Sequence, residues 1–134
     1  MSRHISAFAI VVPNYDEAIE FYVDCAGFHL IEDTDMGDGK RWVLIAPSPV
    51  SETRILLAQA KGDVQSGAIG NQTGGRVGFF LHTDEFDVEY AQMMSAGVHF
   101  EETPRHEPYG KVAVWCDPWG NRWDLLQLTV AAPL

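Results

Sequence analysis

Short runs of β-branched and aromatic residues alternate with two amphipathic stretches along this chain of 134 residues. The apolar run at residues 5–12 predicts a strand, which Pro13 ends. The spacing Asn14-x-x-Glu17 predicts a helix start, because in a capping box each of these side chains bonds to a backbone amide of the first turn. Apolar residues then recur at helical spacing until Gly27, which is typical of a helix end. Three more strands are predicted at residues 28–32, 41–46 and 54–58.

The same pattern returns in the second half of the chain. Residues 14–30 and 84–100 share a polar start, a helical body, an Ala-Gly ending and an apolar-His-apolar entry into a strand. The second copy predicts a helix at 84–96 and strands at 77–82, 98–102, 111–116 and 122–128. The fold class is therefore predicted to be α+β, with βαβββ modules at residues 1–60 and 76–134. Residues 61–75, with five glycines and no hydrophobic period, are predicted to be a mobile linker.

Composition excludes several classes of partner. A formal net charge of -10 argues against binding to nucleic acid or to an anionic membrane surface, which needs clustered Lys and Arg. No apolar stretch approaches the roughly 20 residues that span a bilayer. Cys25 and Cys116 lie in different halves without metal-type spacing, and the N-terminus lacks the features of a signal peptide. These features predict a cytoplasmic protein with reduced thiols.

Two motifs carry a family resemblance. The helix containing Phe21-Tyr22-x-x-x-x-Gly27-Phe28 and the turn Asp117-Pro118-x-Gly120-Asn121, on tandem βαβββ modules, resemble the vicinal oxygen chelate superfamily. That superfamily includes glyoxalase I, bleomycin-resistance proteins, fosfomycin-resistance enzymes and extradiol dioxygenases. The resemblance implies a cupped, partly open mixed sheet around a central cavity. It also implies a homodimer, because paired modules of this family often complete the cup across a two-fold axis.

In the metal-dependent members of this family, four strand positions supply His or Gln, Glu, His and Glu to a divalent ion. Carried onto this chain, these positions fall on Ala7, Ile55, Gly78 (Val77 if the register differs by one) and Asp124. Only Asp124 has a donor, so the resemblance implies a metal-free branch, and no cofactor is predicted. The leading hypothesis is a binder that sequesters a small molecule in an aromatic cavity; no catalytic residue is assigned.

Strand parity suggests what lines the cavity, because alternate residues of a strand face the same side. Parity favours Phe80, His82, Arg122 and Asp124 as ligand-binding residues. Trp42 and Trp115, on strands of opposite modules, and Tyr109, at the expected cavity mouth, complete the predicted set. For the tryptophans, the alternative is a role in the core or in dimer contacts. For Asp124, the alternative to a cavity carboxyl with a raised pKa is a surface partner of Arg122 or Arg76.

Two other functions remain open at the level of sequence. One is a divergent lyase or dioxygenase that uses Fe, Mn, Ni or Zn in a site rebuilt from His82, Asp124 and His106. The other is an interaction module whose cavity has collapsed around Phe80 and the tryptophans.

Overall fold

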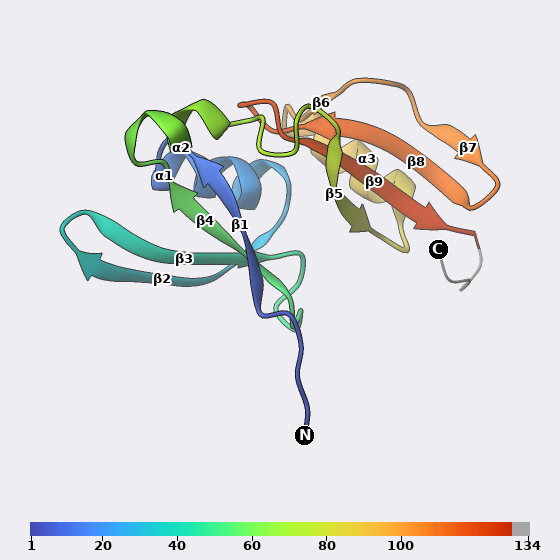
Figure 1. Ribbon diagram of the computed structural model, residues 1–134. Coiled ribbons are helices and arrows are strands. Elements are labelled where there is room, and N and C mark those ends of the chain that lie inside the picture. The colour runs from blue at the N-terminus through green and yellow to red at the C-terminus, as the bar shows by residue number, and fades with distance from the viewer. Residues whose placement is uncertain (130–134) are drawn as a thin grey trace.

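Two sheets, one from each half of the chain, form the body of the computed structural model, which describes residues 1–129 (Figure 1). The last five residues of the second predicted module lie outside this range. Sheet A has the strand order β1-β4-β3-β2, and sheet B the order β5-β9-β8-β6, with the short β7 paired to β8. The strands are β1 (Ala7–Val12), β2 (His29–Gly37), β3 (Lys40–Ala46), β4 (Arg54–Gln59), β5 (Val77–His82), β6 (His99–Phe100), β7 (Arg105–Glu107), β8 (Gly110–Cys116) and β9 (Arg122–Leu128). This is the predicted α+β arrangement of two βαβββ modules.

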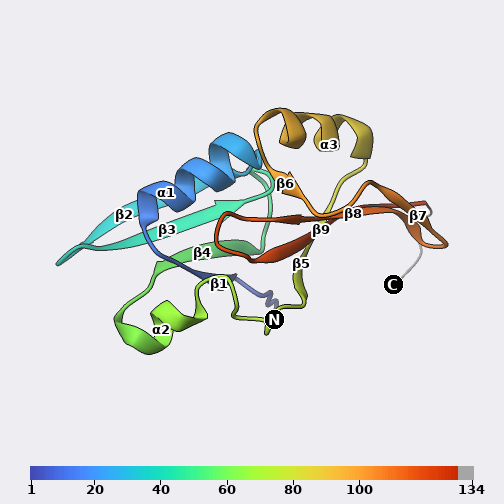
Figure 2. The ribbon, with the colours of Figure 1, turned by 90° about the horizontal axis from the view of Figure 1, so that it is seen from above.

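The helices of both modules lie on the same side of the sheets (Figure 2). In the first module α1 (Tyr15–Ile19) continues directly into a π-helix, η1 (Glu20–Cys25), and the second module has α3 (Phe86–Ser95). Two of the predicted signals hold at the ends of the first helix: Asn14 Oδ1 accepts a hydrogen bond from the Glu17 amide at 3.0 Å, and Gly27 adopts a φ of 82°. The reciprocal bond expected from the Glu17 side chain is not among the hydrogen bonds of residues 1–129. Within residues 1–129, no helix is long and apolar enough to cross a membrane.

The predicted linker has more structure than its composition suggests. It contains α2 (Gly62–Ala68), which buries none of its residues and therefore has no hydrophobic period to reveal it. The side-chain amide of Gln72 then bonds to the free edge of β1, accepting from the Val11 amide and donating to the Ala9 carbonyl, both at 2.9 Å. Gln72 thus takes the place of a neighbouring strand along this edge.

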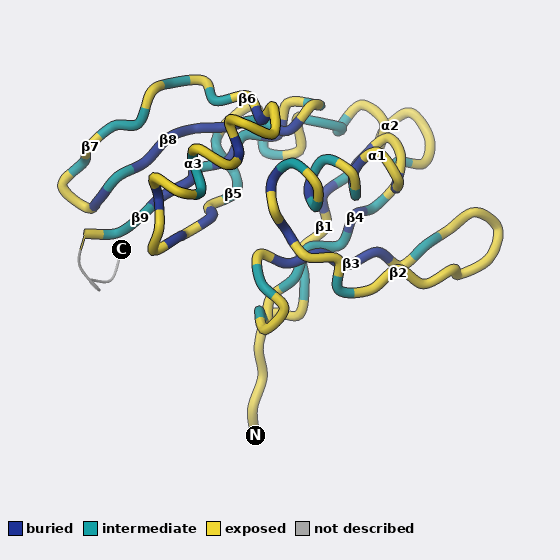
Figure 3. Tube along the Cα trace, turned by 180° about the vertical axis from the view of Figure 1, so that it is seen from behind, coloured by how far each residue is buried: buried dark blue, intermediate teal, exposed yellow. Residues whose placement is uncertain are grey.

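Each sheet has one face against the helices and one face turned away from them, which we call the open face. The buried side chains between helices and sheets form a single core that includes residues of both modules (Figure 3). Its largest fully buried members include Trp115, Tyr22 and Phe86. Since β-strand side chains alternate, the residues between these core positions face the open side.

A buried hydrogen-bond cluster, which we call the inter-module clamp, joins the π-helix to the β8–β9 turn. The Tyr22 hydroxyl donates to Asp117 Oδ2 at 2.7 Å and accepts from Trp123 Nε1 at 3.2 Å. Asp117 in turn accepts from Asn121 Nδ2 at 2.6 Å and from the turn amides. Burial, and then the Asp117 carboxylate, raise the pKa of Tyr22 well above its usual value. The two motifs that carry the family resemblance therefore hold the modules together.

Candidate functional site

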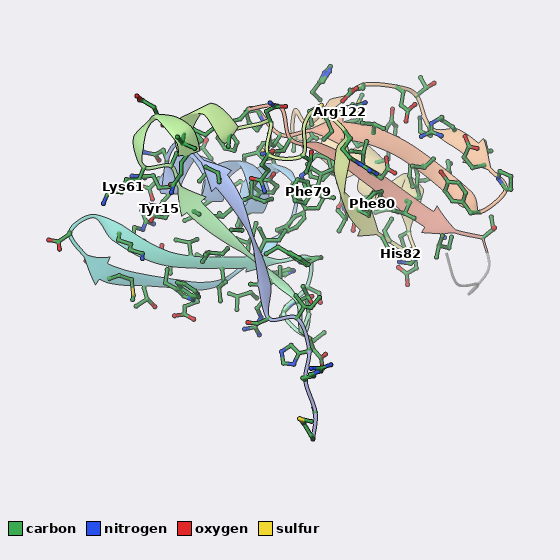
Figure 4. All side chains as sticks on the ribbon, viewed as in Figure 1. Tyr15, Lys61, Phe79, Phe80, His82 and Arg122 are labelled. Carbon is green, nitrogen blue, oxygen red and sulfur yellow. The ribbon has the colours of Figure 1, made fainter. Side chains whose placement is uncertain are left out.

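A pocket of about 420 Å³ lies at the seam between the two sheets, within the size range of small-molecule sites. We call it the seam pocket. Its walls come from β1, β4, β5 and the segment after α2, and five of its residues are aromatic. They are Phe8, Ala9, Phe28, Pro47, Thr53, Arg54, Ile55, Gln72, Thr73, Gly78, Phe79, Phe80, Leu81 and Trp123. In Figure 4, Phe79, Phe80 and His82 follow one another along β5, and Arg122 lies near the start of that strand.

Of the four family positions expected from the sequence, Gly78 and Ile55 line the seam pocket, whereas Ala7 and Asp124 do not. The pocket walls contain no carboxylate, imidazole or thiol side chain. The chemistry of the lining is mainly apolar and aromatic, with polar groups from Arg54, Gln72 and Thr73.

The structure shifts one of the four positions by one residue. Gln59 accepts a hydrogen bond from the first amide of α1, that of Tyr15, and Gln127 accepts one from the first amide of α3, that of Phe86. These two glutamines are therefore equivalent, and Asp124 corresponds to Leu56. Ile55 instead packs against the core on the helix-facing side. The corrected position still carries no metal donor.

The position of Gly78 is also unsuited to a metal-ligating side chain. A Cβ atom added there would overlap the side chain of Thr73, which the segment after α2 lays over this glycine. Residues 1–129 contain no group of three or more His, Cys, Asp or Glu side chains that could hold a metal ion. The residues at the family positions therefore do not fit a catalytic divalent ion.

The rebuilt metal site of His82, Asp124 and His106 is not assembled either. His106 pairs with Lys111, which pairs with Gln127 on the helix-facing side of sheet B. Asp124 and Gln127 lie an odd number of residues apart on β9, so their side chains are on opposite faces and Asp124 is on the open face. His82 lines a separate hollow of about 370 Å³ beside the seam pocket. The strand register thus turns His106 and Asp124 to opposite faces.

The other predicted cavity residues are placed as follows. Phe80 lines the seam pocket and is 60% exposed, whereas Trp115 is completely buried and stacks on Trp123 in the core. Trp42 lies on the open face of sheet A, opposite Thr34, and is partly exposed. Tyr109 is partly exposed in the turn before β8. Neither Trp42 nor Tyr109 lines the seam pocket of this chain.

Several lining residues were not among those predicted, notably Phe79 and Trp123. Their rings stack at 4.9 Å between centroids. Trp123 pairs with Trp115 across the β8–β9 hairpin, so both indoles face the helices. The signal in the sequence that could have placed Trp123 is the length of the 117–121 turn, because this length sets which residues of the two strands oppose one another.

Arg122 is held by a carboxylate other than Asp124. Its guanidinium bonds to both oxygens of Glu101, at 2.8 and 2.9 Å, and these bonds lower the pKa of Glu101. The Cys116 thiol donates to the same carboxylate at 2.8 Å. Burial, and then Glu101, raise the pKa of Cys116 to about 12, so the thiol stays protonated at neutral pH.

Asp124 is the one family position with a charged side chain, and its surroundings disfavour the charge. Within residues 1–129, its buried Oδ1 has no hydrogen-bond partner. Burial is the main cause that raises the pKa of Asp124, and Glu102 adds to it, whereas Arg105 and Arg122 act in the opposite direction. A carboxyl group in this position is poorly compensated when ionised.

We expect Asp124→Asn to unfold at a higher temperature than the wild type at pH 7. The folded pKa lies above the unfolded value of about 3.9. The folded state therefore retains the proton where the unfolded chain has lost it, and stability falls as pH rises through this window. Urea unfolding of both proteins at several pH values between 4 and 8 measures the difference between their free energies of unfolding, and this difference should shrink towards pH 4. Asp24→Asn, at an exposed position, is the control. A gain in stability of Asp124→Asn that does not depend on pH, or a loss of stability at pH 7, would contradict this account.

The chain matches one family model and two curated relatives. The model of the glyoxalase/bleomycin resistance protein/dioxygenase superfamily matches residues 4–125. An uncharacterized protein of Shewanella frigidimarina is 46% identical over 135 residues, covering 100% of both chains. The protein YetH of Bacillus subtilis is 26% identical over 124 residues, covering 90% of this chain and 95% of its own.

Solved structures include two with the same architecture over nearly the whole chain. TnmS3, an antibiotic-binding protein from Streptomyces sp. CB03234, has a TM-score of 0.79 at 29% identity, covering 96% of this chain and 98% of its own. UcmS2 has a TM-score of 0.80 at 26% identity, covering 94% and 98%.

Proposed function

Because the chain belongs to the glyoxalase/bleomycin resistance protein/dioxygenase superfamily, we propose that it binds an aromatic small molecule in the seam pocket and sequesters it without chemical change. One observation carries this proposal: the seam pocket is lined mainly by aromatic and aliphatic side chains, and residues 1–129 contain no group of His, Cys, Asp or Glu side chains that could hold a metal ion. The similarity to an antibiotic-binding protein supports a ligand of antibiotic type.

The lining suggests how such a ligand is held. Phe80 is 60% exposed, so a flat ring can stack on it and gain both buried area and the preferred offset geometry of aromatic pairs. Arg54, Gln72 and Thr73 add polar groups at the rim, which can fix the orientation of the ligand. Sequestration then needs only that bound ligand is unavailable to its target, with no bond made or broken.

We also propose that the binding species is a homodimer. The open faces of the two sheets carry partly exposed aromatic rings, Trp42 at 39% on sheet A and Phe80 at 60% on sheet B. A second copy that lays one module over the other's open face would cover both rings and enlarge the pocket. Light scattering on the eluting peak measures the mass, which should be twice the 14.9 kDa of one chain.

We expect Phe80→Ala to weaken the binding of aromatic probes at least tenfold, equivalent to about 1.4 kcal/mol. Acridine, daunorubicin and bleomycin A2 serve as probes, and quenching of tryptophan emission reports binding because Trp123 lines the pocket. The fold should be unaffected, since the Phe80 ring is mostly exposed.

Met94→Ala is the matched control, because Met94 is 49% exposed on α3, on the helix side of sheet B. It should leave both binding and unfolding unchanged. If none of the three probes quenches the emission or raises the melting temperature of the wild type, the proposed function is wrong. Equal affinities of the wild type and Phe80→Ala would remove the seam pocket as the site.

A further inference from the structure

The seam pocket has a neighbour along the same strand edge, the hollow lined by His82, which we call the polar hollow. Within residues 1–129, β5 pairs only with β9 and is the edge strand of sheet B. Residues 78–81 of this strand line the seam pocket, and residues 81–84, at and after its end, line the polar hollow. The two cavities also share Phe28 and Pro47 of the first module. They therefore follow one another along the free edge of β5.

The spacing of the two cavities fits a single ligand. Each residue of a strand advances about 3.3 Å, so the centres of the two stretches of β5 lie about 10 Å from one another. Pro47, which both cavities share, is exposed, so it does not form a deep wall between them. A flat ring system in the seam pocket can thus place a substituent in the polar hollow without leaving the protein surface.

The polar hollow differs from the seam pocket in its chemistry. Its polar side chains are those of Ser48, His82, Thr83, Asp84 and Glu89, and no lysine or arginine lines it. Within residues 1–129, neither of the two carboxylates is paired with a basic side chain. Their full negative charges outweigh the roughly half positive charge at the nearby N-terminus of α3. The polar hollow therefore favours a group that donates hydrogen bonds and carries positive charge.

We propose that the polar hollow is a second subsite beside the seam pocket and that the ligand class is flat aromatic systems that carry an amino sugar. A protonated amino sugar supplies ammonium and hydroxyl donors to the carboxylates of Asp84 and Glu89. This inference rests on the proposed binding function, and it adds the chemistry of the second part of the ligand. The net charge of -10 favours the same class, because it raises the local concentration of cations.

The test compares two probes that differ by one amino sugar, daunorubicin and its aglycone daunomycinone, by equilibrium dialysis at pH 7.5 against the full chain. We expect the wild type to bind daunorubicin at least tenfold more tightly than the aglycone. The double variant Asp84→Asn, Glu89→Gln should reduce this preference to threefold or less by weakening daunorubicin alone. Phe80→Ala should weaken both probes by a similar factor and keep their ratio, because it acts on the ring system that they share.

The double variant Glu85→Gln, Asp24→Asn is the charge-matched control, since both residues are exposed and line neither cavity. It should leave the preference unchanged, which separates a local contact from general attraction of cations. If both probes bind the wild type without a preference, or if Asp84→Asn, Glu89→Gln keeps the wild-type ratio, the polar hollow is not a subsite although the binding function stands. If neither probe binds the wild type, this inference fails, and acridine and bleomycin A2 then decide the proposed function separately.

Discussion

Replacing Asp117 by alanine should lower the free energy of unfolding by about 3–5 kcal/mol, the range seen when one partner of a buried charged network is removed. Asp117 Oδ1 accepts hydrogen bonds from the amides of Trp119, Gly120 and Asn121, at 3.1, 3.0 and 2.9 Å. Its Oδ2 accepts from Tyr22 and from the Asn121 side chain. The substitution leaves these buried donors without an acceptor, and it opens the inter-module clamp.

Urea unfolding followed by far-UV circular dichroism measures this loss. Asp24→Ala, the same change at an exposed position, should stay within about 0.5 kcal/mol of the wild type. Tyr22→Phe removes one hydroxyl of the clamp and should cost less, about 1–2 kcal/mol. A loss below about 1 kcal/mol for Asp117→Ala would show that the clamp does not hold the modules together.

The second large effect is expected from Gly70→Ala, at about 2–5 kcal/mol. Gly70 has a φ of 73°, and an added Cβ would overlap the backbone carbonyl of Trp119 in the β8–β9 turn. A left-handed backbone costs an ordinary residue about 1–2 kcal/mol, and overpacking about 1–3 kcal/mol more. The segment must therefore move off the turn, and it carries Gln72 and Thr73, which form part of the pocket wall.

Gly67→Ala provides the matched control only three residues earlier. Gly67 lies inside α2, and an added Cβ would meet nothing within 4 Å. Alanine is favoured over glycine in a helix by up to about 1 kcal/mol, so this variant should be as stable as the wild type or more so. Thermal unfolding of both variants, with acridine binding as a second readout, measures the contrast. Equal behaviour of the two would mean that the linker does not rest on the turn.

Signals confined to a few neighbouring residues predicted the fold well. The helix-capping Asn14, the helix-ending Gly27 and the 117–121 turn each specify a local geometry that the structure confirms. These local units, repeated in the same order, were sufficient for the family and for the α+β class. α2 escaped prediction because it buries no side chain and so leaves no pattern.

The details of the site depended on register, which single-residue shifts alter. Aligning Leu56-Leu57 with Leu125-Leu126 placed the second family position on Ile55, whereas aligning Gln59 with Gln127 places it on Leu56. Trp115 was assigned to the cavity together with Asp124, although the hairpin pairs it with Trp123 on the other face. Both corrections concern which face a side chain occupies, and that is decided by hydrogen bonding between distant strands.

The side chain of Gln72 has a consequence for the solution behaviour of the protein. An uncovered strand edge presents unpaired amides and carbonyls on which another chain can add a strand, the usual first step towards aggregation. At β1, one amide group already occupies the Val11 amide and the Ala9 carbonyl. A single glutamine, placed by an irregular segment, thereby protects an edge for which many proteins use a whole helix or a row of lysines.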